Sequence, residues 1–572
     1  MKLSIVIVLA TATLVALYSP RPRQSTNLQV DLGYSIYEGF YNELSGVNEW
    51  QGIRFAAPPI GNLRWQAPQP PIFNRSTIIQ ASGIPDQCPQ SPANVGTGNY
   101  ITENNGPSVS EDCLFLDVFA PVGDIQNLPV LVWIHGGGYG LGNGRQDLAP
   151  AIRANDDSFI GVSIQYRLGA FGFLSSDEVN RFGVPNAGLR DQTFALQWVQ
   201  SYIHLFGGNA SRVTIMGVSA GAGSVMLQAM AYGGTMGTSL FTNAIAASPY
   251  LPMQYNYNDW IPSQSYYAFA AAAGCLSGSA YGSPAGVKSP FKCLVEKDTA
   301  TLQNASASIS ASGTWGSLGF LPVTDGKFIQ QRPSAQLQKK QVNGLRVMSG
   351  NVALEAAGFV PQNITTEDAL ISWMRVVFPL FTDDDISKVL RYYPNSDASD
   401  STSAVGYATS GYTGATAINV SSIATGHQQR ANNIYAETTF VCPSYWLTEA
   451  YTSNAIFVNF ITINNPSIPS SIASGNSSSD SSPTPSSSED TDSMFNWPAY
   501  TSGQPLMLNL NETGGEEYTA VGITFNGTPI SVTQARNPGL KNNFTLVDAH
   551  SWEGGRGVRC DFWRSVGESV PE

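Results

Sequence analysis

The hydrophobic and polar positions of this chain alternate between short strand-like runs and longer helix-like ones. Runs rich in β-branched and other apolar residues at 130–134, 159–166 and 212–216 predict buried β-strands. The stretches 191–205 and 220–232 predict helices, and the second of them is rich in Ala and Met. Buried strands that alternate with helices are typical of a mostly parallel sheet covered by helices, so the predicted fold class is α/β.

Two stretches depart from this pattern. Lys2 is followed by an apolar run at 3–18 and then by small and polar residues, which predicts a secretory signal peptide over residues 1–19. The alternative is a membrane anchor, but the run is shorter than the ~20 residues that a membrane-spanning helix needs, which favours the signal peptide. Between about 464 and 492 the chain is dominated by Ser, Pro, Thr and Asn, which predicts a flexible surface insertion. We expect the rest, 20–572, to form a single domain.

The composition narrows the possible partners. Of the 572 residues 42% are hydrophobic, which is enough for a sizeable core. Lys and Arg number 29 against 42 Asp and Glu, for a net charge of −13, and no basic block is present. We therefore expect no nucleic-acid partner, and no stable membrane insertion once a signal peptide is removed. The sequence gives no indication of the oligomeric state.

Cysteines and glycosylation motifs point to an oxidising, extracellular location. Six cysteines suit such a compartment, and the simplest pairing is local: Cys88 with Cys113, and Cys275 with Cys293. Cys442 and Cys560 then either pair with each other or stay free. Nine Asn-x-Ser/Thr motifs predict a secreted glycoprotein, although some are chance matches: Asn74, Asn209, Asn304, Asn363, Asn419, Asn476, Asn511, Asn526 and Asn543.

The first sign of chemistry is a G-x-S-x-G motif at 217–221. A strand-like run ends at Met216 and a helix-like run begins at Ala220, so Ser219 stands at a strand-to-helix turn. Small neighbours at such a turn tolerate the strained backbone and expose the serine hydroxyl. The motif alone is short enough to occur by chance, and its context is what identifies Ser219 as a candidate nucleophile.

A glycine cluster follows the strand that ends at Ile134. Consecutive glycines in the run from His135 to Tyr139 would let backbone N–H groups approach a ligand closely, as an oxyanion hole requires. Ala220, directly after the serine, would supply a further N–H. An ordinary glycine loop is the alternative, and His135 is expected to belong to its scaffold rather than to act as a base.

Together these segments resemble the type-B carboxylesterase/lipase family, which also includes the cholinesterases and the fungal secreted lipases. The matching stretches are 52–61, 111–118, 135–139, 186–192, 206–209 and 217–221, and they cover residues 30 to about 250 almost continuously. The resemblance is greatest to the fungal members. It implies an α/β-hydrolase fold and hydrolysis of small-molecule or lipid esters without a metal or organic cofactor. It does not distinguish a lipase from an esterase of small substrates.

The resemblance also implies roles for individual residues. Ser219 would be the nucleophile, and Gly137, Gly138 and Ala220 would supply the amides of the oxyanion hole. The acid of the family is a glutamate in a glycine-led loop after a strand, which points to Glu355, with a surface glutamate as the alternative. The loop between Cys88 and Cys113 would be the flap near the mouth of the site, and Cys275–Cys293 would be the second bridge. Val218 departs from the family, many members of which carry an acidic residue before the serine.

The histidine of a Ser-Glu-His triad is not found where the family places it. The chain has four histidines, and none lies between Pro443 and Trp497, where the family carries its histidine loop. Instead the sequence passes near Ile456 into a segment that resembles a region normally found beyond that loop. His550 and His427 are the remaining weak candidates for the base.

Three hypotheses account for this gap. The chain is a mis-spliced or mispredicted product of an active esterase gene, since family-like sequence stands on both sides of the junction near Ile456. Alternatively, it is a catalytically silent relative that serves in binding or adhesion. In the third, His550 or His427 has been recruited as the base. Serine is a poor nucleophile without a positioned base, so the three hypotheses differ in the activity that they predict.

Overall fold

The computed structural model describes most of the chain from residue 28 to residue 451. The described residues are 28–92, 108–276, 289–313, 316–352, 355–356, 358–393, 395, 424, 426–451 and 560–564, with the backbone of strands at 455–460, 508–513, 517–523, 529–531 and 544–547. The expected signal peptide, the Ser/Pro-rich insertion and His550 lie outside them.

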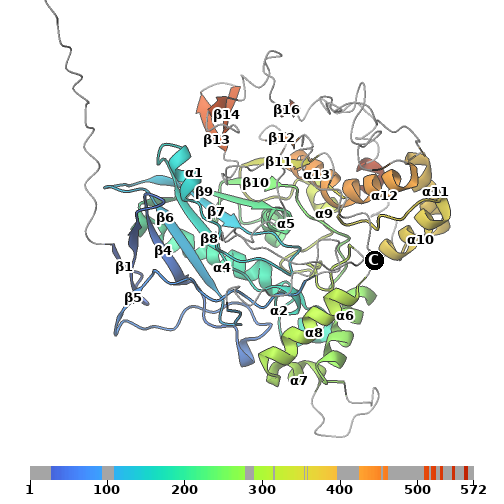
Figure 1. Cartoon of the computed structure of the whole chain (residues 1–572), viewed down its shortest axis with the longest axis horizontal. Coiled ribbons are helices and arrows are strands. Elements are labelled where there is room, and N and C mark those ends of the chain that lie inside the picture. The colour runs from blue at the N-terminus through green and yellow to red at the C-terminus, as the bar shows by residue number, and fades with distance from the viewer. Residues whose placement is uncertain are drawn as a thin grey trace, which may run out of the picture.

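A ten-stranded mixed sheet runs through the centre of the molecule (Figure 1). Six neighbouring strands, β8, β7, β9, β10, β11 and β12, are parallel, and the strands at both edges are antiparallel. The order across the sheet is β16 (Phe544–Val547), β12 (Ala455–Phe460), β11 (Arg346–Val352), β10 (Asn243–Ala247), β9 (Gly208–Val218), β7 (Leu128–Ile134), β8 (Ile160–Ile164), β6 (Phe115–Ala120), β4 (Val47–Arg54) and β3 (Phe40–Asn42). Two small sheets are formed by β1 (Gln29–Asp31), β2 (Ile36–Glu38) and β5 (Ile78–Gln80), and by β13 (Leu508–Thr513), β14 (Glu517–Ile523) and β15 (Pro529–Ser531).

Helices pack against the sheet, and further helices gather on one side of it (Figure 1). This arrangement confirms the predicted α/β class. The α-helices are α1 (Ala149–Ala154), α2 (Gly169–Phe173), α3 (Asp177–Phe182), α4 (Ala187–Tyr202), α5 (Ala220–Met230), α6 (Trp260–Ala272), α7 (Pro290–Glu296), α8 (Thr299–Ser312), α9 (Pro333–Gln338), α10 (Glu367–Val377), α11 (Asp383–Tyr392), α12 (Gly426–Ala436) and α13 (Cys442–Tyr451). Shorter turns are η1 (Gly61–Leu63), η2 (Ile203–Phe206), η3 (Ala231–Gly234) and the π-turn η4 (Glu437–Val441). Within the described ranges, no helix combines the length and the apolar character needed to cross a bilayer.

The strands are apolar on both faces because both faces are covered. In β7, Val130 and Val132 belong to the large core, while Leu131 belongs to a smaller second core that also contains Leu148 and Ile152. Successive side chains of a strand point to opposite faces, so the continuous apolar run at 130–134 supplies both cores at once.

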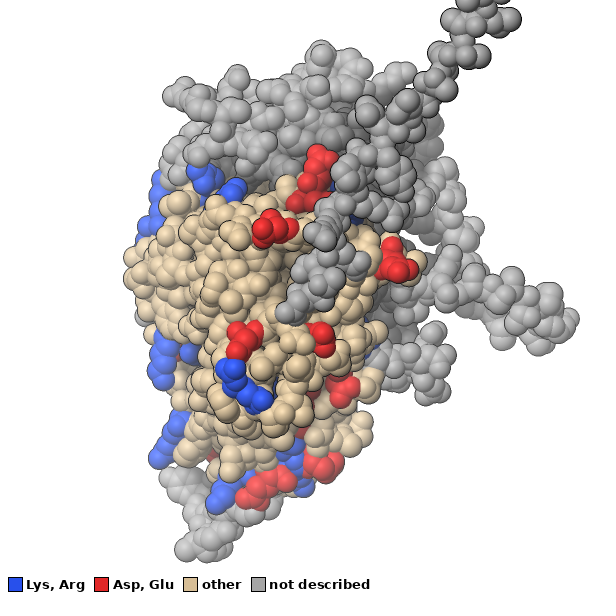
Figure 2. All heavy atoms as spheres, turned by 90° about the vertical axis from the view of Figure 1, so that its left-hand side faces the viewer, with Lys and Arg blue, Asp and Glu red and all other residues tan. Residues whose placement is uncertain are grey.

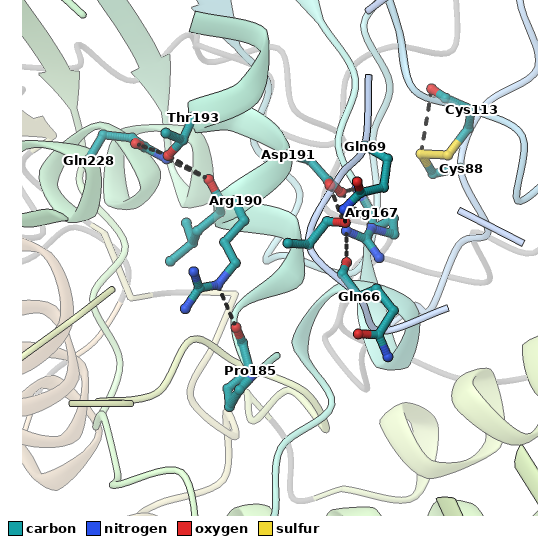
Figure 3. Close-up of polar contacts among 12 residues, drawn as sticks. Gln66, Gln69, Cys88, Cys113, Arg167, Pro185, Arg190, Asp191, Thr193 and Gln228 are labelled. Carbon is teal, nitrogen blue, oxygen red and sulfur yellow. Dashed lines mark hydrogen bonds and ion pairs between the residues drawn. A yellow bond between two sulfur atoms is a disulfide. The ribbon is translucent and has the colours of Figure 1, made fainter. Parts of the chain in front are cut away.

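A buried ion pair fixes α4 to the segment that follows β8 (Figure 3). The guanidinium of Arg167 donates two 2.7 Å hydrogen bonds to the carboxylate of Asp191 and a third, of 2.9 Å, to the carbonyl of Gln66. Both charged side chains are almost fully buried. Such a pair is costly to break from one side, because the remaining charge would be left without a partner away from water.

Three disulfides are present among the described residues. Cys88–Cys113 and Cys275–Cys293 pair as expected, and Cys442 is bonded to Cys560, which decides the pairing that the sequence left open. This third bridge ties residues 560–564 to the start of α13 across a sequence separation of 118 residues.

The C-terminal segment 560–564 packs into a cluster of aromatic side chains. The indole N–H of Trp563 donates a 2.8 Å hydrogen bond to the hydroxyl of Tyr393, and its ring stacks on Phe378 and Phe381. The segment therefore joins the core by packing as well as by the disulfide.

Charges of both signs are present on the side of the molecule that carries β1 and β5. In Figure 2 the basic side chains stand mainly along one rim of this side, and the acidic ones are spread from its upper part to its lower end. Neither sign covers this face, which is the opposite of the continuous basic surface that binding of a nucleic-acid backbone uses.

Candidate active site

Ser219 lies at a sharp turn between β9 and α5, where the sequence placed it. Its backbone has φ +56° and ψ −125°, a conformation that side chains other than glycine rarely adopt. Hydrogen bonds hold this strained residue: its N–H donates to Ala247 (3.0 Å), and its carbonyl accepts from Gly223 (2.8 Å) and Tyr250 (3.1 Å). The turn is thus fixed by its own helix α5 and by the residues at and just after the end of β10.

The two glycines of the G-x-S-x-G motif are required by close packing. A Cβ on Gly217 would lie 2.4 Å from the carbonyl carbon of Gly221, and one on Gly221 would lie 2.1 Å from the carbonyl oxygen of Ile134. Both distances are shorter than any contact a real Cβ makes, so the turn can close only with glycine at these positions.

The glycine loop that follows β7 lies directly against the serine. A Cβ on Gly136 would stand 3.2 Å from the Cβ of Ser219 and 2.7 Å from the carbonyl oxygen of Val218. The next residues adopt left-handed backbone conformations, with φ +100° at Gly137 and +62° at Gly138. The loop therefore turns its backbone, and no side chain of its own, toward the serine.

Three backbone N–H groups at this place are free to bind a ligand. Among the described residues, no hydrogen bond uses the amides of Gly137 and Gly138, because the turn is closed instead by the carbonyl of Gly137. Ala220 is the first residue of α5, and such a residue has no acceptor within its own helix. Ala220 directly follows Ser219, and Gly137 and Gly138 belong to the loop that packs against it, which is the placement expected of oxyanion-hole donors.

Glu355 follows β11 on the same edge of the sheet. One carboxylate oxygen accepts a 2.8 Å hydrogen bond from the amide of Val352, and the carboxyl also bonds to the side chain of Ser248. Ser248 comes directly after β10, and its N–H donates to the carbonyl of Gly350. Since β9, β10 and β11 are parallel neighbours, Ser219, Ser248 and Glu355 all follow the carboxyl ends of adjacent strands.

Burial changes the acidity of this carboxyl. It raises the pKa of Glu355 from 4.5 to about 7, and the hydrogen bonds from Ser248 and Val352 oppose the rise. No cation is among the causes of the shift. Among the described residues, the carboxyl is therefore held by neutral donors.

Two of the histidines have structural surroundings of their own. His135 is buried, stacks on Tyr166 with ring centroids 4.4 Å apart, and has its Nδ1 2.9 Å from the carbonyl oxygen of Gly136. Burial lowers its pKa to about 4, so its ring is neutral at physiological pH. His204 is exposed in η2. Both observations fit the expectation that neither is the general base.

His427 lies at the start of α12, among charged side chains. Its Nδ1 is 3.1 Å from the guanidinium of Arg430, which itself pairs with Glu367 at 2.9 Å. Among the described residues, no hydrogen bond joins His135, His204 or His427 to Ser219 or Glu355. The structure thus brings the serine, the amides and the glutamate to one edge of the sheet without a described histidine bonded to Ser219 or Glu355, and His550 lies outside the described residues.

Two neighbours of the site were not predicted from the sequence. Leu318 packs against the glycine loop, because a Cβ on Gly138 would lie 3.0 Å from one of its methyl groups. Ser248 is the hydrogen-bond partner of Glu355. Neither residue belongs to a motif. The only signals in the sequence are that Ser248 follows a strand and that Leu318 lies between two glycines.

Comparison with known proteins agrees with this geometry. The family model described as the carboxylesterase family matches residues 26–517. The chain belongs to the carboxylesterase family. Lipase 2 of Geotrichum candidum is 33% identical over 424 residues, which are 68% of this chain and 72% of the relative.

Other carboxylesterase relatives have related descriptions. A secreted triacylglycerol lipase, LIP1 of Gibberella zeae, is 32% identical over 377 residues, 61% of this chain and 62% of the relative. The crystal structure of Aspergillus niger EstA matches with a TM-score of 0.61 and 29% identity, covering 74% of this chain and 75% of that one. The predicted α/β-hydrolase fold is thereby confirmed, as is the family of carboxylic ester hydrolases.

Proposed function

We propose that this carboxylesterase is a serine hydrolase of small-molecule or lipid esters and that Ser219 is its nucleophile. The observation that carries the proposal is the position of Ser219, strained at φ +56° and packed against Gly136 of the glycine loop, in which the amides of Gly137 and Gly138 have no hydrogen bond among the described residues. Strained backbone of this kind persists only where the surrounding structure holds it, and it clusters at functional sites.

In this mechanism, Oγ of Ser219 attacks the ester carbonyl carbon, while its proton passes to a general base. The amides of Gly137, Gly138 and Ala220 bind the oxyanion that forms. When the tetrahedral intermediate collapses, the C–O bond to the alcohol breaks, and the base returns its proton to the leaving alkoxide. Water then repeats the sequence on the acyl-enzyme and releases the acid. Glu355 would orient and stabilise the base when it becomes cationic.

The identity of the base is the open part of the proposal. His427 lies 3.1 Å from the guanidinium of Arg430, and among the described residues it has no hydrogen bond to Ser219 or Glu355. We therefore favour His550 over His427 as the recruited base, if this chain turns over. A His427→Ala variant is expected to keep full activity, while His550→Ala loses it.

The direct test is hydrolysis of a short-chain p-nitrophenyl ester by the full chain, with Ser219→Ala as the matched variant. Turnover that disappears in Ser219→Ala supports the proposal. Equal rates for the two proteins would overturn it for this chain and direct attention to the transcript across the junction near Ile456. Removal of one triad member leaves only a small residual rate, so the two outcomes are well separated.

A second function is favoured by one observation, the lack of a hydrogen bond between any described histidine and Ser219 or Glu355. Without a base the same pocket would bind an ester or carboxylate without turning it over, as in a binding or adhesion relative. A fluorophosphonate probe separates the two readings, because it bonds only to an activated serine. Labelling of Ser219, located by mass spectrometry and absent from Ser219→Ala, counts against the silent protein.

We further propose that the chain is secreted and glycosylated. The three disulfides suit an oxidising compartment, and several relatives are described as secreted lipases. Mass spectrometry of the protein from culture medium should find an N-terminus just after residue 19 and a mass that falls on enzymatic deglycosylation. Retention in the cell with residues 1–19 intact would contradict this.

A further inference from the structure

The stem of the loop between Cys88 and Cys113 packs against the later part of the glycine loop, at Gly140 and Gly142. The stem is the segment from Cys88 to Ser91, and its disulfide to Cys113 appears at the right of Figure 3. The amide of Ser91 donates a 2.7 Å hydrogen bond to the carbonyl of Gly140. A Cβ on Gly140 would lie 2.3 Å from the carbonyl oxygen of Ser91, so the two backbones are in direct contact.

Gln90 holds the end of the glycine loop by bonding to both the N–H and the carbonyl of one residue, Gly142. Its Oε1 accepts a 2.8 Å hydrogen bond from the amide of Gly142, and its Nε2 donates a 3.0 Å bond to the carbonyl of the same glycine. Nε2 also donates a 2.7 Å bond to the carbonyl of Cys88, which fixes the side chain to its own stem. One side-chain amide thus joins the disulfide-linked stem to the loop.

The stem itself is anchored to a separate helix. The hydroxyl of Ser91 lies 2.9 Å from that of Ser306 and 2.8 Å from that of Ser310, both on α8. These three serines are buried. Ser306 also accepts a 3.0 Å hydrogen bond from the amide of Ala170. The stem is therefore a fixed support against which Gln90 can hold the loop.

The loop needs such a support because of its composition. Its residues from 136 to 142 include five glycines, which lose more conformational freedom on ordering than any other residue. Gly142 itself has φ +106°, and a Cβ there would lie 2.4 Å from the ring of His135. Of its own side chains only those of Tyr139 and Leu141 are buried, so the order of the five glycines depends on backbone hydrogen bonds and on groups outside the loop.

We propose that Gln90 is a positioning residue, which holds the glycine loop so that the amides of Gly137 and Gly138 face Ser219. It does not touch the substrate. The effect on turnover rests on the function proposed above, whereas the effect on the order of the loop does not. Oxyanion-hole donors act through exact placement, since their stabilisation depends on not having to reorganise during the reaction.

The test compares hydrogen exchange of the full chain in wild type and Gln90→Met, which keeps the length of the side chain but makes no hydrogen bonds. A peptide covering residues 136–142 should exchange up to about 30-fold faster in the variant, the factor expected for the loss of the two hydrogen bonds to Gly142. Gln165→Met is the matched control. Gln165 donates hydrogen bonds to the carbonyl of Asp86, which precedes the stem, and to that of Cys113, which is disulfide-bonded to it. It has no hydrogen bond to the glycine loop.

A charge variant gives a second readout that simple loss of stability would not produce. In Gln90→Glu the ionised carboxylate accepts from Gly142 but cannot donate to its carbonyl, so exchange should be fast near neutral pH. Below about pH 4 the neutral carboxyl regains a donor, and loop exchange should approach that of wild type at the same pH. Absence of this recovery would remove the role of the donated bond.

Activity and exchange separate this proposal from the proposed function. If wild type hydrolyses the ester, Gln90→Met should lower kcat by up to about 100-fold with KM little changed, as misplaced catalytic groups do. If wild type is inactive, the proposed function fails, and exchange still decides the role of Gln90. Equal loop exchange in Gln90→Met and wild type, or an equal increase in Gln165→Met, would overturn the proposal.

Discussion

Replacement of Glu355 by Gln tests the surroundings of the candidate acid without requiring any activity. Burial raises the pKa of this carboxyl from 4.5 to about 7, so the folded protein holds the proton more tightly than the unfolded chain. The stability that this proton contributes is complete below pH 4.5 and is lost as the pH rises through 7. Gln is neutral at every pH and cannot lose this contribution. The free energy of unfolding of Glu355→Gln should therefore increase relative to that of wild type as the pH rises.

The size of the effect follows from the two pKa values. The difference between 4.5 and about 7 corresponds to about 3 kcal/mol, since each tenfold change in proton affinity is worth 1.36 kcal/mol. Glu355 remains partly exposed, and solvent reduces the figure, so about 2 kcal/mol is expected. Asp117, whose pKa burial also raises to about 7, contributes equally to both proteins and cancels in the comparison.

The assay is urea unfolding of wild type and Glu355→Gln at pH 5 and pH 8, with Glu43→Gln, an exposed glutamate, as the control. The stability difference between wild type and Glu355→Gln should shift by about 2 kcal/mol between the two pH values. A constant difference would refute the buried-carboxyl reasoning. A shift of opposite sign would mean that a cation contacts Glu355 and lowers its pKa, as a histidine recruited from outside the described residues would do.

Three further changes test other parts of the structure. Gly136→Ala places a methyl group 2.7 Å from the carbonyl oxygen of the residue before the nucleophile. We expect the free energy of unfolding, measured by thermal unfolding, to fall by about 1–3 kcal/mol and phosphonate labelling of Ser219 to slow. Unfolding and labelling equal to those of wild type would show that the loop does not lie against the serine. Arg167→Met should cost about 3–5 kcal/mol in denaturant unfolding, and adding Asp191→Leu should restore most of it; no recovery would mean that lost packing dominates. Removing the Cys442–Cys560 bridge, which spans 118 residues, should cost about 4–5 kcal/mol, whereas an unchanged melting temperature would credit the aromatic packing alone.

The regular elements near the site could be predicted because their patterns are local. The run at 130–134 becomes β7, and the switch at Ser219 from strand to helix occurs where the sequence places it. Boundaries are less local. The helix expected over 191–205 is α4, Ala187–Tyr202, and the following residues tighten into η2, which ends at Gly207 with φ +89°. Packing against other parts of the fold decides where a helix ends, and a short stretch of sequence does not contain that information.

The site could be predicted only as far as its motifs reach. Ser219 and the glycine loop carry short motifs with a mechanical reason for each glycine, and the structure places them in contact. Ser248 and Gln90 carry none, because their importance comes from one hydrogen-bond partner far along the chain. The Cys442–Cys560 pairing was also out of reach, since only the fold brings two residues so distant in sequence to bonding distance.

The Cys442–Cys560 bridge has a consequence for proteolysis. A protease that cuts the chain anywhere between these two cysteines produces two fragments that remain one covalent molecule until the disulfide is reduced. The last fragment would keep its place, because Trp563 is also hydrogen-bonded to Tyr393 and stacked among aromatic rings. Nicked protein should therefore migrate as a single band on a non-reducing gel and as two bands after reduction. The same anchor fixes the point to which the chain returns, so the intervening segment can change in length during evolution without displacing the C-terminal residues.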